Sequence, residues 1–480
     1  MSPKGRPEGE FAPKRVSAEG SPVSTHATTS GLAPAVTDDP AVEALFQDVA
    51  RALDAELAAG ERYTAWFEAE ASDFVRMNRG KVRQAGRVRQ QSIAVRLIQG
   101  ARHAEHTLSL TGNATVDAGA AVDALRGLRA ALPELAEDPH LMLPEGVSST
   151  RSVRGGRLPP SGEVIERVLD LARGTDFVGF YASGPMYRGF ANAEGQRNWH
   201  AAATFSLDWS LYHRADKAVK SLYAGFEWSD TEIAARMTDA RERLALVTRE
   251  ARTIAPGRYR AWLAPSAMEE ITSLLCWGGF SGRAQATRQS ALARMQDGEC
   301  LDPRVTITES IETGVAPAFQ SDGFTRPPSV SLVERGRHAG ALVSPRTARE
   351  FGLEANGANA WEMPEALSMA GGTLPDADAL AALDTGLLIG NLWYLNYSDR
   401  PACRMTGMTR FATFWVEDGR VVAPVNVMRF DDTIYRLLGS KLEALSATPE
   451  LLLATESYGS RRLASSRLPG ALVSEMTFTL

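Results

Sequence analysis

The sequence predicts a two-domain α+β protein, with antiparallel β-sheets and packed helices in an N-terminal domain and a β-rich C-terminal domain. In the first half, stretches with helical hydrophobic spacing separate runs of strand-like alternation. The second half opens with helical segments and then consists mostly of strand-like runs and turn signals. No fixed-period repeat is present. The chain of 480 residues is long enough for two or three domains at roughly 150 residues each.

Residues 1–37 predict a disordered tail, because they are rich in small and polar residues and poor in large apolar ones. Regular structure is expected to begin at Asp38-Asp39-Pro40, since Asp is a good N-cap and Pro suits the first helical turn. Apolar residues then recur at helical spacing up to Gly60. The first helix is therefore placed before Gly60.

Further elements of the N-terminal domain follow from period and turn signals. A capping box at Ser229 and Glu232 begins a long helix, which Pro256-Gly257 closes. We place the domain boundary there, giving domains of residues 38–254 and 255–480. The remaining elements predicted before this boundary are strands at 63–79, 88–98 and 103–111, helices at 116–131 and 162–173, and a second β stretch at about 176–226.

The C-terminal domain is predicted to open with a strand at 258–264 and a helix from Pro265 to about Trp277. A second helix is expected near 283–295. The rest is strand-rich, and Asp418-Gly419 predicts a tight hairpin turn. Residues 396–410 are predicted to form a polar loop between two strands.

Composition excludes several classes of protein. The net charge of −6 and pI near 5.8 give no basic footprint for nucleic acid. No run of 18 apolar residues suggests a membrane helix, and the first twenty residues contain no apolar core of a secretory signal. Three widely spaced cysteines are typical of reduced thiols in a cytoplasmic protein.

Familiar catalytic motifs are missing. The sequence contains no phosphate-binding loop, no dinucleotide fingerprint after a strand and no Gly-x-Ser-x-Gly elbow. None of the seven histidines forms His-x-x-x-His. His103 and His106 lie on a predicted strand, where a spacing of three directs them to opposite faces. They are therefore not expected to hold a metal together.

The densest polar cluster lies within residues 396–410. It could be a hydrogen-bonded loop that positions the following strand, or one wall of a peptide groove whose donors and arginines hold a backbone or a carboxylate. Cys403 lies near two arginines, which could lower the pKa of its thiol, but a structural thiol is favoured because no histidine is near in sequence. The candidate groove residues are Asn396, Ser398, Arg400, Arg404, Thr406 and Arg410.

Three blocks of sequence, in this order and spacing, resemble the TldD/TldE (TldD/PmbA) metallopeptidase family. The resemblance covers about residues 62–480. The blocks are Phe74–Lys81 with Ser92–Gly100, then Asn192–Gly195 with the long helix and Pro256–Tyr259, and finally Thr406–Phe411 with Phe414–Gly419 and Pro424-Val425.

The resemblance implies two kinds of subunit. The TldD type carries His-Glu-x-x-x-His on a helix early in the C-terminal domain, where one face holds zinc and the Glu acts as general base. The TldE type lacks this motif and pairs with TldD. Here the motif position falls on Cys276–Ser281, and its degenerate residues include Cys276, Trp277 and Ser281. Cys403 has no histidine pair to complete a three-ligand site. No metal is therefore expected in this chain.

The leading hypothesis is a TldE/PmbA-like subunit that forms part of the substrate groove for an extended peptide. Its partner would be a TldD-like subunit that holds the zinc. Rival hypotheses are a stand-alone peptide-binding protein or homodimer, and an enzyme with chemistry centred on Cys403. The family's association with DNA gyrase modulation gives a further reading, but the acidic balance gives no reason to expect direct contact with nucleic acid.

Overall fold

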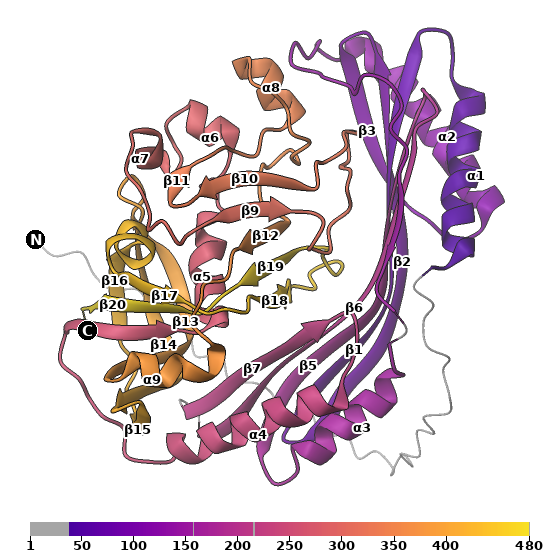
Figure 1. Cartoon of the computed structure of the whole chain (residues 1–480). Helices are drawn as coiled ribbons and strands as arrows, with labels where there is room; N and C mark the ends of the chain where they lie inside the picture. The colour runs from indigo at the N-terminus through magenta and orange to yellow at the C-terminus, as the bar shows by residue number, and fades with distance from the viewer. Residues whose placement is uncertain (1–37, 157, 215–216, 480) are drawn as a thin grey trace, which may run out of the picture. The chain divides into compact units, whose positions relative to one another are not determined.

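Three β-sheets organise the chain in a computed structural model that describes residues 38–156, 158–214 and 217–479 (Figure 1). The predicted tail, residues 1–37, lies outside the described residues. Helices pack on the first, N-terminal sheet, and the two later sheets make the C-terminal half β-rich. The α+β class predicted from the sequence is confirmed.

The first sheet has the order β3-β2-β1-β5-β6-β4, and β7 also pairs with β6. Its neighbouring strands are antiparallel, except that β4 lies parallel to β6. The strands are long because apolar and polar residues alternate over long runs of sequence. In the first half of β1, for example, every second residue is buried. The strands are β1 (Glu61–Asn78), β2 (Lys81–Gln99), β3 (Arg102–Ser109), β4 (Arg151–Arg154), β5 (Asp176–Asn192), β6 (Arg197–Arg214) and β7 (Lys217–Gly225).

Four described helices accompany this sheet, and three of them, α1, α2 and α4, start at a side-chain cap. The Asp39 side chain accepts a hydrogen bond from the backbone N–H of Ala41, as predicted. Ser229 likewise accepts from the N–H of Glu232. The Glu232 carboxylate instead pairs with Arg236, so only half of the predicted capping box forms. The helices are α1 (Pro40–Glu56), α2 (Ala114–Ala131), α3 (Ser161–Leu171) and α4 (Asp230–Val247).

The second and third sheets are built from the C-terminal half. Both combine antiparallel pairs with one parallel pair, β12 with β19 and β8 with β13. The second sheet contains β9 (Ile307–Ser310), β10 (Ser329–Glu334), β11 (Arg337–His338), β12 (Ala366–Met369), β18 (Glu450–Leu453) and β19 (Ser465–Leu468). The third contains β8 (Gly257–Leu263), β13 (Gly386–Asp399), β14 (Arg404–Glu417), β15 (Arg420–Pro424), β16 (Arg429–Thr433), β17 (Leu442–Leu445) and β20 (Ala471–Phe478).

Short helices connect these strands. The single helix predicted near 283–295 is wrong, because the region forms two short helices. Arg288 adopts a left-handed φ of 58°, which a continuous helix does not allow. The helices are α5 (Pro265–Leu275), α6 (Gly282–Ala286), α7 (Ala293–Gln296), α8 (Pro345–Phe351) and α9 (Ala379–Leu383), with short turns η1 (Leu132–Glu134), η2 (Asp376–Asp378) and η3 (Arg436–Ser440).

Residues 396–410 form no loop, which corrects the prediction. They belong to the β13–β14 hairpin, whose turn is confined to residues 400–403. Burial alternates from the last turn residue into β14, where Cys403, Met405 and Gly407 are buried and the residues between them face outward. The segment was predicted as a loop because its outward-facing residues are polar. Only every second residue lies in the core, as in a strand with one exposed face.

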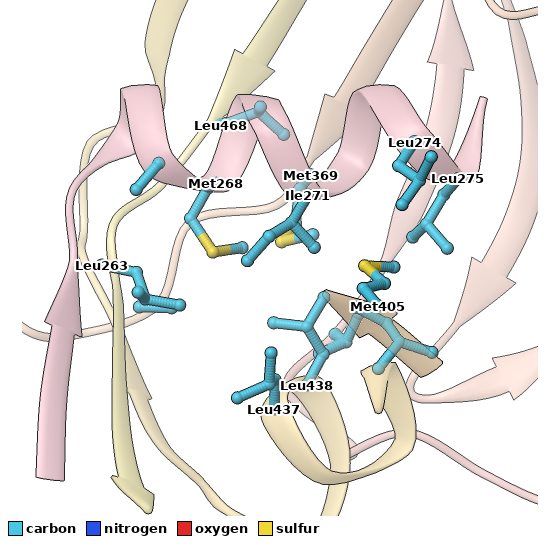
Figure 2. Packing of buried hydrophobic residues seen from close by; sticks show 14 of the residues in the cluster. Leu263, Met268, Ile271, Leu274, Leu275, Met369, Met405, Leu437, Leu438 and Leu468 are labelled. Atoms are coloured by element: carbon cyan, nitrogen blue, oxygen red, sulfur yellow. The ribbon is translucent and has the colours of Figure 1, made fainter. Parts of the chain in front are cut away.

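Helix α5 lies over the core of the C-terminal half. Its buried residues include Met268, Ile271 and Leu275, which recur at helical spacing. Figure 2 shows this face directed towards Met405 of β14 and Leu438 of η3. The segment that holds the family's motif position therefore begins where a fully packed helix ends.

A second core joins the N-terminal and C-terminal halves. Leu207 and Trp209 of β6 belong to the same buried cluster as Trp262 of β8 and Phe414 of β14. We call this cluster the seam. Both halves contribute to the seam. The domain boundary proposed at residue 254 therefore stays a prediction. In the described part of the chain, no helix is long and apolar enough to cross a membrane.

Candidate functional site

The predicted groove residues lie on one hairpin, and four of them share its outward side. Asn396 pairs with Thr406 across the hairpin, and Ser398 and Arg404 lie closer to its turn. Asn396, Ser398 and Arg404 are exposed and Thr406 is half-buried. We call this side the outer face. It presents amide, hydroxyl and guanidinium groups along a single strand pair.

Two of these side chains are held by the neighbouring strand β16. Arg404 forms an ion pair with Asp431, with 2.9 Å between Nη1 and Oδ1. The Thr406 hydroxyl donates to the carbonyl of Phe430 at 3.0 Å and accepts from Nε of Arg429 at 3.0 Å. Arg404 nevertheless keeps 44% of its side chain exposed, so its guanidinium can reach a ligand.

Aromatic side chains next to Arg410 were not predicted as part of the site. The Arg410 guanidinium lies 3.8 Å from the ring centroid of Trp393, a cation–π contact. Trp393 is 47% exposed and Tyr394 is 76% exposed. Tyr394 and Phe411 have left-handed φ values of 58° and 57°, at two register shifts of the hairpin. The unbroken apolar run Leu392-Trp393-Tyr394 was the sequence signal for this irregularity, because it violates strand alternation.

Arg400 connects the hairpin to the end of α5. Its Nη2 donates to the backbone carbonyl of Trp277 at 2.7 Å, and its guanidinium lies over the ring of Tyr397. The Tyr397 hydroxyl donates to the carbonyl of Leu274 at 3.0 Å. These bonds bring together two regions that the sequence analysis had singled out separately, the hairpin and the degenerate motif. Arg400 therefore has a structural role in fixing the turn.

The motif position does not have the geometry of a zinc site. Helix α5 ends at Leu275, so residues 276–281 do not share one helical face. Burial raises the pKa of the Cys276 thiol to about 12, which keeps it protonated. The Ser281 hydroxyl caps α6 and bonds to Oε2 of Glu362 at 2.5 Å. Trp277 is 61% exposed and offers no ligand atom. These residues do not fit zinc, and we derive no step through a metal.

Other candidate ligands lie apart. His103 and His106 occupy strand β3 as predicted, and Nε2 of His103 lies 3.2 Å from Oδ2 of Asp138. Within residues 38–156, 158–214 and 217–479, no group of three or more His, Cys, Asp or Glu side chains is arranged to hold a metal ion.

Cys403 is a poor candidate nucleophile. The thiol is fully buried, and burial raises its pKa to about 12 despite the nearby guanidinium groups of Arg294 and Arg400. The arginine charges do act to lower this pKa, but the expected net lowering is wrong, because desolvation of the thiolate outweighs their attraction. Cys403 packs in the core beside Met405.

Helix α5 carries a carboxyl group with an unusual pKa. Burial, together with the charges of Glu270 and Glu456, raises the pKa of Glu269 to about 7. Lys220 of β7 opposes this shift only in part. Glu269 therefore changes protonation near neutral pH.

Residues 256–480 match the PmbA/TldA metallopeptidase C-terminal domain. This C-terminal part of the chain therefore belongs to the PmbA/TldD family. The resemblance read from the sequence blocks is confirmed. No curated protein sequence matches the chain.

Solved structures show that the family fold extends over most of the chain. TldE from Thermococcus kodakarensis superposes with a TM-score of 0.73 at 13% identity, covering 91% of this chain and 100% of that one. A candidate modulator of a DNA gyrase from Thermotoga maritima gives 0.70 at 14% identity, covering 90% and 99%. A similarly described protein from Bacteroides thetaiotaomicron gives 0.69 at 15% identity, covering 91% and 98%. These identities establish likeness of fold.

Proposed function

We propose that this chain is the TldE/PmbA-like, zinc-free subunit of a TldD/TldE-type metallopeptidase complex. The complex would hydrolyse unfolded peptides or mature a peptide precursor. The segment Cys276–Ser281 carries the proposal, because its helix stops short and its side chains serve packing and capping. The zinc and the general base would then come from a TldD-like partner in the cytoplasm.

In this division of labour, the chain contributes part of the substrate groove. The outer face of the β13–β14 hairpin supports this role, since it offers exposed donors on a rigid strand pair. An extended peptide presents backbone groups and carboxylates that such donors recognise. Arg404 and Arg410 would hold the substrate while the partner cleaves it.

Reconstitution with a chain that carries His-Glu-x-x-x-His tests this division directly. We expect zinc analysis of the purified pair to give one equivalent per heterodimer, and analysis of this chain alone to give none. Peptide turnover should require both chains. Stoichiometric zinc that stays on this chain through chelator treatment would contradict the proposal.

The groove is tested by the double variant Arg404→Ala/Arg410→Ala in the reconstituted pair. Turnover of an unfolded peptide should fall at least tenfold while zinc content is unchanged. Arg420→Ala is the matched control, because Arg420 is exposed on β15 away from the outer face. Peptide binding without any pairing or turnover would favour the rival view of a stand-alone peptide-binding protein.

A further inference from the structure

One edge of the first sheet is long, basic and uncovered. Strand β3 pairs with β2 only from Ser92 to Gln99, which leaves residues 81–90 without a paired strand on that side among the described residues. All ten residues from Lys81 to Gln90 are exposed. We call residues 81–91 the β2 edge. Figure 1 shows β2 in the outer part of the curved sheet beside β1.

The backbone of the β2 edge offers free hydrogen-bonding groups in a regular order. The carbonyl of Gln91 accepts a bond from the N–H of Leu110 on the β3 side. In an antiparallel ladder every second residue bonds to the same side, so Ala85, Arg87 and Arg89 point their N–H and C=O groups outward as well. The register shift lies at Arg83, and the ladder from Gln84 to Gln91 is regular.

The charge of this edge is one-sided. Residues 76–91 contain six Arg or Lys residues and no Asp or Glu, within a chain of net charge −6. Arg87 is neutralised by Asp73, with 2.6 Å between Nε and Oδ1. Lys81, Arg83 and Arg89 form no ion pair with any described residue. A second copy of this edge would be repelled, whereas an acidic strand would be attracted.

A polar cavity lies where β3 leaves the sheet. Its volume of about 330 Å³ is within the usual range of roughly 300–1,000 Å³ for ligand sites. Its lining includes Arg89, Gln91 and Ser109, and Glu68 on the sheet. Oε1 of Gln91 is buried and has no hydrogen-bond partner among the described residues, so it is free to accept an N–H.

We propose that the β2 edge and this cavity bind an extended acidic peptide segment, which adds to the first sheet as a strand. The segment would run antiparallel to β2 in line with β3, and its N-terminal residue would enter the cavity. An extended peptide satisfies the outward N–H and C=O groups together, whereas a phosphate backbone could use only the N–H groups. Exposed Val82 and Val88 add apolar contact. This inference goes beyond the proposed function, since it requires neither a catalytic partner nor turnover.

Fluorescence anisotropy with the full chain and a fluorescein-labelled decapeptide of alternating Glu and Thr tests the site. The acidic peptide should bind, and its Lys-Thr counterpart should not. Arg83→Glu/Arg89→Glu should weaken binding at least tenfold. Arg51→Glu/Arg173→Glu makes the same charge change on the exposed surfaces of α1 and the end of α3, and should leave binding within threefold. Melting curves check that each variant is folded.

Backbone pairing is separated from simple charge attraction by N-methylating alternate amides of the acidic peptide in either phase. Strand addition predicts that one phase loses binding at least tenfold and the other keeps it within threefold. Equal effects in both phases would overturn the proposal. So would oligothymidylate of equal charge that binds as tightly and with the same dependence on Arg83 and Arg89, because the site would then be one for nucleic acid.

Discussion

Arginine side chains have different roles in two regions of this molecule. In the loop after β18, Arg461 is buried in the first sheet, where it donates to the backbone carbonyls of Gly184 and Thr204 at 3.0 Å each. In the β13–β14 hairpin, Arg404 is 44% exposed, and the half-buried Arg410 lies over the exposed ring of Trp393. The difference shows that partners, more than residue type, separate a structural arginine from one available to a ligand.

Both terminal nitrogens of Arg461 donate to buried acceptors, so removing the side chain leaves those acceptors without donors. Burial lowers the pKa of Arg461 to about 10, which reflects the cost of holding a charge there. The hairpin arginines lose less hydration than Arg461 does. They form their strongest hydrogen bonds only when a carboxylate ligand binds. Substitutions at both kinds of arginine, with measurement of the free energy of unfolding, test this difference.

The largest effect is expected for Arg461→Ala. Removing a buried, hydrogen-bonded charge should lower the free energy of unfolding by about 3–5 kcal/mol, because the Thr204 carbonyl loses its donor and Glu70 loses its counter-charge. Urea denaturation measures this change. The neighbouring Arg462 is exposed, and Arg462→Ala should cost less than ~0.5 kcal/mol. An equal loss in the free energy of unfolding for both variants would show that Arg461 does not stabilise the fold.

The inner side of the hairpin should be nearly as sensitive. Met405 is fully buried beneath α5, and Met405→Ala should cost about 2–5 kcal/mol through the cavity it leaves. Met363→Ala, at a side chain that is 37% exposed, is the control and should cost much less. A small loss at Met405 would mean that this part of the core refills the space.

A smaller, pH-dependent effect is expected at Glu269. Its pKa rises from about 4.5 in the unfolded chain to about 7 in the folded one, so the folded state binds the proton more tightly. Stability should therefore decline as pH rises from about 4.5 to 7, by about 1–2 kcal/mol from this group. Thermal melts across this range should show a flatter profile for Glu269→Gln. Glu166→Gln, at an exposed position on α3, should keep the wild-type profile.

The smallest effect on stability is expected on the outer face. Arg404→Ala and Arg410→Ala should each change the free energy of unfolding by about 0.5 kcal/mol or less, because their contacts are exposed. Urea denaturation of the single variants measures this. A loss of several kcal/mol would assign these arginines to the framework and remove them from the groove.

Local signals in the sequence predicted the elements that depend on local physics. Asp39-Pro40 marks the start of α1, and Asp418-Gly419 forms the hairpin turn with φ values of 50° and 69°. The parallel pairing of β12 with β19 could not be read, because it joins strands almost a hundred residues apart. The contacts of Arg461 are equally remote, since Thr204 lies 257 residues away in the sequence. The polar residues of the candidate groove were predicted from the sequence. The neighbouring Trp393 and Tyr394 were not, because they are exposed through a register shift of the hairpin.

The seam has a consequence for synthesis of the chain. Strand β6 is complete at Arg214, but Phe414 and Leu472, which cover its side of the seam, follow some two hundred or more residues later. At roughly 5–20 residues per second, the wait lasts on the order of ten to fifty seconds. During that interval Trp209 and its neighbours lack their C-terminal partners, and the seam is covered by elements made earlier or soon after β6, such as α3 and α4. We expect nascent chains arrested in this interval to be the form that most needs a chaperone.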